Sequence, residues 1–307
     1  MTSSADPLIG LAVLVGAIAL AIFVGVSGAI VVFTVRYRDR GPTAADPAGV
    51  PQIHGNQRLE LLWTAAPLVV LAIVFAASLQ TLAQVGRSAT FGSNEAPVVI
   101  RATGQQWWFD FAYADGWSVP NEVHIPVGVP VEFRVTSRDV IHDLWIPELG
   151  VKTDIIPGRE NILRVYTTRA GTYDGVCAEF CGLEHAWMRF RVVAEPRPAY
   201  DRWIAGQAAA RSAPAGLAAQ GEQVFLGNVC VACHAIRGTA AAAHVGPELT
   251  HLASRAKLAG GVLPNDPVAL RAWLADPQRY KPGSFMPQIT LSATDLTALV
   301  AYLAGLR

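Results

Sequence analysis

Two long uncharged stretches near the start of the chain place the strongest constraint on its fold. Leu8–Val35 contains 28 residues without a charged side chain, and Leu61–Val85 is a second uncharged run. About 20 apolar residues in a helix, at a rise of about 1.5 Å each, cross the hydrocarbon core of a bilayer. The sequence therefore predicts a hairpin of two transmembrane helices within residues 1–90 of a multi-domain membrane protein.

A cleaved signal peptide is the alternative interpretation of the first stretch. Such a peptide has a basic segment before a short apolar core. Residues 1–7 contain no Lys or Arg, and the first stretch is longer than such a core. We therefore expect a retained helix that anchors the chain in a lipid bilayer.

The arginines around these stretches predict their orientation. Arg36, Arg38, Arg40 and Arg58 lie between the two stretches, whereas the outer flanks offer only Arg87. Since cytoplasmic loops carry the excess of Lys and Arg, the connecting loop is expected in the cytoplasm. Both termini and everything after residue 86 are then extracytoplasmic. The net charge of zero gives no indication of a nucleic-acid partner.

Residues 91–196 have the pattern of an all-β domain. Short alternating apolar runs are separated by turns that contain Pro and Gly. The runs are Val98–Ile100, Val131–Val135, Ile162–Tyr166 and Phe190–Val193. This punctuation predicts a small β-sandwich or β-barrel.

Apart from the initiator methionine, the sulfur-containing side chains fall into two clusters. In the β domain, Cys177, Cys181, His185 and Met188 share one segment, and His142 lies upstream. A mononuclear blue-copper site uses two His, one Cys and a weak axial Met. With a second cysteine, two thiolates could bridge two copper ions, each with one imidazole, while Met188 and a backbone carbonyl bind weakly. A Cys177–Cys181 disulfide is the alternative, because an exported domain permits it.

The second cluster lies in residues 217–307. Cys230-Val-Ala-Cys233-His234 has the spacing at which two thioether bonds attach a c-type haem. The adjacent histidine would bind the iron, and Met286 is the remaining methionine for the opposite side. This ligand pair raises the redox potential. A redox-active cysteine pair and half of a zinc site are the alternatives.

The rest of this C-terminal part is expected to be helical. Residues 197–216 are predicted to form a closing helix and a linker. Pro267–Ala275 and Ser292–Leu306 have helical patterns. The segment Gly246–Leu249 resembles the loop that supports the proximal histidine in class I cytochromes c.

Several segments together resemble subunit II of cytochrome c oxidase, here with a fused C-terminal cytochrome c domain as in caa3-type oxidases. The matching segments are Leu59–Thr64, Gly104–Phe109, His142–Pro147, Lys152–Arg159 and the Cys177–Met188 loop. The resemblance implies a cupredoxin-like domain with a dinuclear CuA centre and an all-α class I cytochrome c domain. It also implies a bacterial cytoplasmic membrane, with both cofactor domains on the periplasmic side.

The resemblance also assigns roles to individual residues. It implies terminal copper ligands at His142 and His185, bridging thiolates at Cys177 and Cys181, and weaker ligands at Met188 and the carbonyl of Glu179. The Glu179 side chain would bind a magnesium ion shared with subunit I. Trp107 matches the residue through which electrons reach CuA. Glu60 matches the glutamate at the mouth of the K-type proton pathway, although a glutamate also suits a helix N-terminus.

The resemblance implies a function and a set of partners. Electrons would pass from haem c to CuA and then to subunit I, where O2 is reduced to water with proton translocation. Subunit III and an upstream cytochrome c or bc-type complex are further expected partners. A CuA-containing nitric oxide reductase and a membrane-anchored copper chaperone are the alternatives.

Some positions depart from the family or carry no motif. Phe109 replaces an aromatic residue that is usually Trp, and Asp143 stands where a small or hydroxyl side chain is usual. The remaining histidines are expected to be surface or structural residues: His54, His124, His244 and His251.

Overall fold

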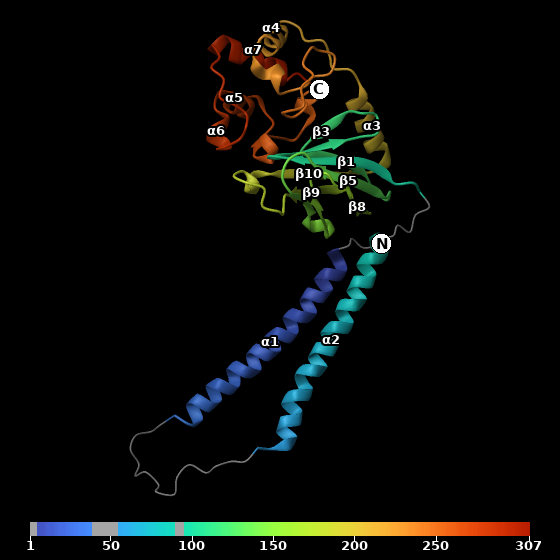
Figure 1. The fold of residues 1–307 in the computed structure, drawn as a ribbon, viewed down its shortest axis with the longest axis vertical. Helices are drawn as coiled ribbons and strands as arrows, with labels where there is room; N and C mark the ends of the chain where they lie inside the picture. The colour runs from blue at the N-terminus through green and yellow to red at the C-terminus, as the bar shows by residue number, and fades with distance from the viewer. Residues whose placement is uncertain (1–4, 39–54, 90–94) are drawn as a thin grey trace. The chain divides into compact units, whose positions relative to one another are not determined.

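The computed structural model describes residues 5–38, 55–89 and 95–307 (Figure 1). The chain divides into two compact units, a helical one within residues 4–90 and a second that begins at residue 91. Among the residues named above, His54 and Arg40 lie outside the described ranges.

The helical unit contains the two predicted helices, α1 (Ala5–Arg36) and α2 (Gln57–Ala89). Both are long and apolar enough to cross a membrane. The Oδ1 atom of Asn56 accepts hydrogen bonds from the amides of Arg58 and Leu59, at 3.0 and 3.4 Å, and so caps α2. Glu60 lies in the first turn of α2.

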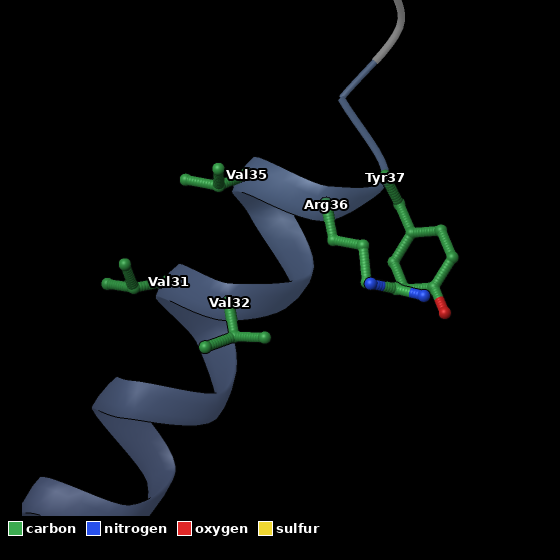
Figure 2. A pocket seen from close by; sticks show the side chains of 5 residues that line it. All are labelled: Val31, Val32, Val35, Arg36 and Tyr37. Carbon is green, nitrogen blue, oxygen red and sulfur yellow. The ribbon is translucent and has the colours of Figure 1, made fainter.

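The end of α1 changes from apolar to polar within one turn. Val31 and Val35 point to one side of the helix, and Arg36 and Tyr37 point to the other (Figure 2). The Arg36 guanidinium carbon lies 6.0 Å from the centre of the Tyr37 ring. Cationic and aromatic side chains of this kind are enriched where a helix leaves a bilayer.

The second unit begins with the predicted β-sandwich, which consists of two five-stranded sheets. One sheet has the order β3-β2-β1-β5-β8 and the other β4-β10-β9-β6-β7. The strands are β1 (Val98–Gln105), β2 (Trp108–Ala112), β3 (Ser118–Pro120), β4 (Glu122–Pro126), β5 (Val131–Ser137), β6 (His142–Ile146), β7 (Val151–Ile155), β8 (Asn161–Val165), β9 (Gly171–Val176) and β10 (Arg189–Glu195). The pairs β1–β5 and β4–β10 are parallel, and the other pairs are antiparallel.

Aromatic rings fill the space between the sheets. Phe109, Phe111 and Phe190 are buried, with ring centres 4.9 Å apart for Phe109–Phe190 and 5.5 Å for Phe111–Phe190. A Cβ atom at Gly175 would lie 2.1 Å from the Phe190 ring, so that position accepts no side chain. Phe109 is therefore a core residue, which explains why this position keeps an aromatic ring.

Helix α3 (Arg197–Ala208) follows the last strand, as predicted, and covers the sandwich. Trp203 on α3 stacks on His124 of β4, with ring centres 3.9 Å apart and planes 8° apart. His124 also contacts Glu195 at 2.9 Å and Glu122 at 3.4 Å. His124 is thus a buried structural residue, as expected.

The C-terminal part is mainly helical, with α4 (Leu217–Leu226), α5 (Pro267–Ala275), α6 (Pro277–Tyr280) and α7 (Ala293–Leu303). Helix α5 has its predicted bounds, whereas α7 ends three residues before Leu306. Short elements connect them: η3 (Val229–Ala232), η4 (Leu252–Ser254), η5 (Ala259–Gly261), and the β11 (Lys257–Leu258) and β12 (Leu263–Pro264) pair.

Helices α4 and α7 pack directly against each other. A Cβ atom at Gly221 would lie 2.0 Å from the carbonyl oxygen of Ala298, so glycine permits this close approach. One turn along, Phe225 packs against Tyr302 at 6.0 Å between ring centres. This crossing forms one side of a separate hydrophobic core.

Candidate metal centres

The first sulfur cluster comes together at one end of the sandwich. His142 begins β6, and the loop between β9 and β10 supplies Cys177, Cys181, His185 and Met188. Cys177 Sγ lies 3.9 Å from His142 Nδ1, and Cys181 Sγ lies 3.6 Å from His185 Nδ1. Cys181 Sγ is also 3.8 Å from Met188 Sδ. The structure therefore gathers all five predicted side chains.

The two cysteines of this loop are free thiols whose sulfur atoms lie 3.8 Å apart. The disulfide alternative is therefore wrong. The contact between the two thiols lowers the pKa of Cys177 and raises the pKa of Cys181. The pair thus carries a negative charge readily, which suits soft, thiolate-binding metal ions.

A backbone carbonyl also faces the cluster. The Glu179 carbonyl oxygen accepts a hydrogen bond of 3.2 Å from Cys177 Sγ, while the Glu179 side chain is exposed. Two thiols, two imidazole nitrogens, a thioether and a carbonyl oxygen are therefore directed at one small volume. This donor set fits two copper ions, with the sulfur atoms between them.

Asp139 also contacts the cluster, although no motif in the sequence indicates it. Its Oδ1 atom lies 2.8 Å from His142 Nε2, and its Oδ2 atom accepts a hydrogen bond of 2.7 Å from the Gln106 amide. Burial lowers the pKa of His142, but the contacts with Cys177 and Asp139 outweigh it and raise that pKa. A carboxylate on the far nitrogen fixes the orientation of a metal-binding imidazole. Its position three residues before His142 is the sequence signal for this contact.

Gly104 supports the same imidazole from β1. A Cβ atom there would lie 3.0 Å from His142 Cδ2. Trp107, three residues later, is buried and donates a hydrogen bond of 3.0 Å from Nε1 to the Cys181 carbonyl. Gln106 donates to the same carbonyl at 2.8 Å. Residues 104–107 therefore contact the cluster both at His142 and at Cys181.

Asp143, which departs from the usual family residue at this position, lies near a lysine. Its side chain is fully buried next to His142, and Lys152 Nζ lies 3.7 Å from its Oδ2 atom. Burial raises the pKa of Asp143 to about 7. Lys152 on the neighbouring strand therefore partly compensates for a carboxyl group in place of a small side chain.

The second sulfur cluster lies at η3. Cys230 and Cys233 are free, and the His234 amide donates a hydrogen bond of 2.9 Å to the Cys230 carbonyl. His234 Nδ1 lies 2.7 Å from the Pro247 carbonyl. Burial lowers the pKa of His234, which favours the neutral imidazole, and with Nδ1 at the Pro247 carbonyl the Nε2 atom is the one left for a metal ion.

The loop around Gly246 supports this histidine, as the sequence predicts. A Cβ atom at Gly246 would lie 2.7 Å from His234 Cε1. Met286 is half-buried against the same hydrophobic core, and Gln278 Nε2 donates a hydrogen bond of 3.0 Å to its carbonyl. Two free thiols, an imidazole and a thioether within this one domain fit a covalently attached haem.

The other candidates join neither cluster. His251 is buried, with Nε2 3.2 Å from the Ala209 carbonyl, and is structural. His244 is exposed. Glu60 belongs to the helical unit and bonds to Asn56 through its backbone amide at 2.9 Å.

Three families match successive parts of the chain. Residues 2–81 match the family described as cytochrome C oxidase subunit II, transmembrane domain. Residues 116–195 match cytochrome C oxidase subunit II, periplasmic domain, and residues 218–307 match cytochrome c.

Curated relatives agree with these matches. "Cytochrome c oxidase subunit 2" of Alkalihalophilus pseudofirmus is 39% identical over 83% of this chain and 75% of its own length. The protein of that name from Bacillus subtilis is 32% identical over 91% of this chain and 83% of its own length. The chain belongs to the cytochrome c oxidase subunit II family.

Membership of this family confirms the predicted fold class and function. The chain is an electron-transfer subunit of a haem–copper oxidase, anchored in a membrane by apolar helices. It carries a copper domain and a fused cytochrome c domain, and works with other oxidase subunits such as subunit I. The oxidase is supported over nitric oxide reductase, and the cytochrome c match supports haem over a zinc half-site.

Proposed function

We propose that the first cluster holds the dinuclear CuA centre. His142 and His185 are its terminal ligands, and Cys177 and Cys181 bridge the two ions. Met188 and the Glu179 carbonyl are the weak ligands. The arrangement of four further donor groups around the two free thiols supports this assignment. Two copper ions held by these residues would supply a one-electron carrier.

We also propose that the C-terminal domain binds haem c, because its side chains match the ligands that such a haem requires. Cys230 and Cys233 form the thioether bonds, and His234 and Met286 are the axial ligands. The hydrogen bond from His234 Nδ1 to Pro247 fixes the ring orientation that this role requires. The haem supplies a one-electron carrier of raised potential, which suits a donor to CuA.

Trp107 connects the two centres. Its indole donates to the carbonyl of the copper ligand Cys181, and its ring centre lies 4.9 Å from that of Phe285. Phe285 directly precedes the haem ligand Met286. This contact is the observation that carries the proposal, and it supports electron flow from haem c through Trp107 to CuA and on to subunit I.

Two acidic residues have further roles in this proposal. The Glu179 carboxylate is exposed and binds a magnesium ion shared with subunit I. Glu60, in the first turn of α2, stands at the mouth of the K-type proton pathway.

The proposed topology places residues 1–90 in a bacterial cytoplasmic membrane, with both termini outside. The copper domain (91–196), the closing helix and linker (197–216) and the haem domain (217–307) are periplasmic. Subunit III and an upstream cytochrome c or bc-type complex complete the set of partners. A reporter active only in the cytoplasm should work when fused near residue 47 and be silent after Arg307, and the reverse result would contradict this topology.

The copper assignment is tested with Cys181→Ser in the purified oxidase. Loss of one bridging thiolate should abolish the mixed-valence EPR signal of a copper pair. The haem absorption bands should remain, because the haem domain has its own core. A variant that keeps the two-copper signal would overturn the assignment. The oxidase function is tested separately, by measuring whether the wild-type complex turns over O2 rather than NO.

A further inference from the structure

A buried ion pair joins the haem domain to the copper loop. Lys281 Nζ lies 3.2 Å from Glu184 Oε2, and the two side chains are only 6% and 1% exposed. Lys281 also donates a long hydrogen bond of 3.5 Å to the Trp107 carbonyl. Glu184 directly precedes the copper ligand His185, and Lys281 is five residues before Met286. The pair therefore links the two segments that carry metal ligands.

Burial makes this pair selective for the docked arrangement. A misaligned dock would bury either charge without its partner, which is strongly unfavourable, so the pair selects the alignment in which Lys281 meets Glu184. Such a pair is also screened by salt far less than an exposed one. Docking through Lys281 is therefore expected to resist changes in ionic strength.

A second set of contacts holds the other side of the haem domain. Gln105 Nε2 donates to the Val245 carbonyl at 3.2 Å, and Arg138 Nη1 donates to the His244 carbonyl at 2.9 Å. His244 and Val245 lie just before the Gly246–Pro247 loop that supports His234. Residues 105–107 thus contact the loops beside both proposed axial ligands.

Two glycines of the haem domain lie at the contact with the copper domain. A Cβ atom at Gly283 would meet the end of the Leu183 side chain in the copper loop, 2.2 Å from its Cδ2 atom. A Cβ atom at Gly260 would lie at ordinary van der Waals distance from two carbonyl oxygens, 3.4 Å from that of Trp187 and 3.7 Å from that of Trp107. Both glycines therefore lie beside the segments that carry Glu184 and Trp107.

We propose that Lys281 is a positioning residue: its ion pair with Glu184 holds the haem domain in a preformed dock that keeps Phe285 on Trp107. The proposal rests on the assigned electron transfer between the centres. One electron leaves the reduced haem group and reduces the oxidised copper centre, with no bond formed or broken. Because the dock exists beforehand, this transfer needs no search by a tethered domain.

The test compares Lys281→Met with Lys257→Met in the complete oxidase. Lys257 belongs to the same domain but is exposed, so it is a matched control. The first readout is hydrogen–deuterium exchange of peptides that contain residues 105–107 and 281–286. Lys281→Met should raise their exchange rates at least about tenfold, and Lys257→Met should leave them unchanged. The second readout is the haem-to-copper electron-transfer rate after photochemical reduction, which should fall at least about tenfold in Lys281→Met alone.

The wild-type protein provides an independent test. Its internal electron-transfer rate should stay constant between low and high salt, whereas that of Lys281→Met should become salt-dependent. A wild-type rate that changes steeply with salt would overturn the proposal even if no variant folds. So would unchanged exchange and rates in a Lys281→Met protein with normal copper and haem spectra. Wild-type protein that lacks those spectra would instead refute the assigned centres.

Discussion

The Oδ1 atom of Asp139 lies 2.8 Å from Nε2 of His142, on the side of the imidazole that faces away from the Cys177 thiol. Asp139→Asn keeps the shape but removes the charge that orients this ring. We predict that copper affinity falls about 10- to 100-fold, as expected for a residue that supports a metal ligand. Titration against a copper chelator measures this, with the exposed Asp115→Asn as control. Equal affinities in the two variants would contradict the role of Asp139.

Met188 should tune the copper centre without being needed to hold it. Its thioether is fully buried 3.8 Å from Cys181 Sγ. Met188→Leu nearly conserves volume and removes a weak ligand, so the copper content should be unchanged while the absorption spectrum and reduction potential shift. Metal analysis and a redox titration of the same sample check both halves. Loss of the copper would show that Met188 is a principal ligand.

Gly221 should be intolerant of even a methyl group. A Cβ atom there would meet the Ala298 carbonyl at 2.0 Å, across the contact of α4 with α7. We predict that Gly221→Ala lowers the unfolding free energy of the haem domain by about 2 kcal/mol, the usual effect of overpacking. Gly206→Ala is the control, because Gly206 is an exposed glycine with open space around it on α3, outside the haem domain. That change should leave the unfolding of the haem domain unchanged. Thermal unfolding followed in the haem absorption band distinguishes the two.

Asp110 should make stability depend on pH. Burial raises the pKa of Asp110, although Ser118 and nearby cations oppose the shift. When folding raises the pKa of a carboxyl group, the group adds most to the free energy of unfolding below its unfolded pKa of about 3.9. That stabilisation is lost as the pH rises through the folded pKa. Asp110→Asn should therefore be more stable than wild type at pH 7, by about 1 kcal/mol, and lose the advantage near pH 3. Denaturant unfolding across this pH range measures the difference, and an advantage that grows in acid would contradict it.

Removal of the haem domain should separate two kinds of activity. Truncation near Ala213 leaves the copper domain, whose core is separate from that of the haem domain. Its copper spectrum and its turnover with a small artificial donor should survive. Turnover with the natural donor should fall steeply, and added cytochrome c should restore only part of it, because the effective concentration of a tethered domain is lost. Full turnover with the natural donor would show that the haem domain does not lie on the main path of electrons to the copper centre.

Local spacing made most of the two centres predictable from the sequence. Cys177, Cys181, His185 and Met188 lie within one loop, so their order along the chain already reflects their arrangement in space. Strands and helices followed from alternation and apolar length. The alternatives to each centre required the free thiols of the structure or the family matches to decide between them.

What the sequence did not reveal depends on contacts between distant segments. Lys281 and Glu184 are nearly a hundred positions apart, and each resembles an ordinary surface charge until the domains meet. Gly221 similarly has no motif, since its importance comes from Ala298 on another helix. Asp139 is close to His142 in the chain, but only the β6 geometry turns its carboxylate toward the ring.

The α4–α7 contact has a consequence for how the protein is made. Because α4 packs on a helix that is synthesised much later, the core of the haem domain is completed only near the end of its synthesis. Cys230 and Cys233 lie between these helices in the sequence, so they are made before that core can close. The order of synthesis therefore gives the two thiols a period in which haem can be attached before the fold shuts around it.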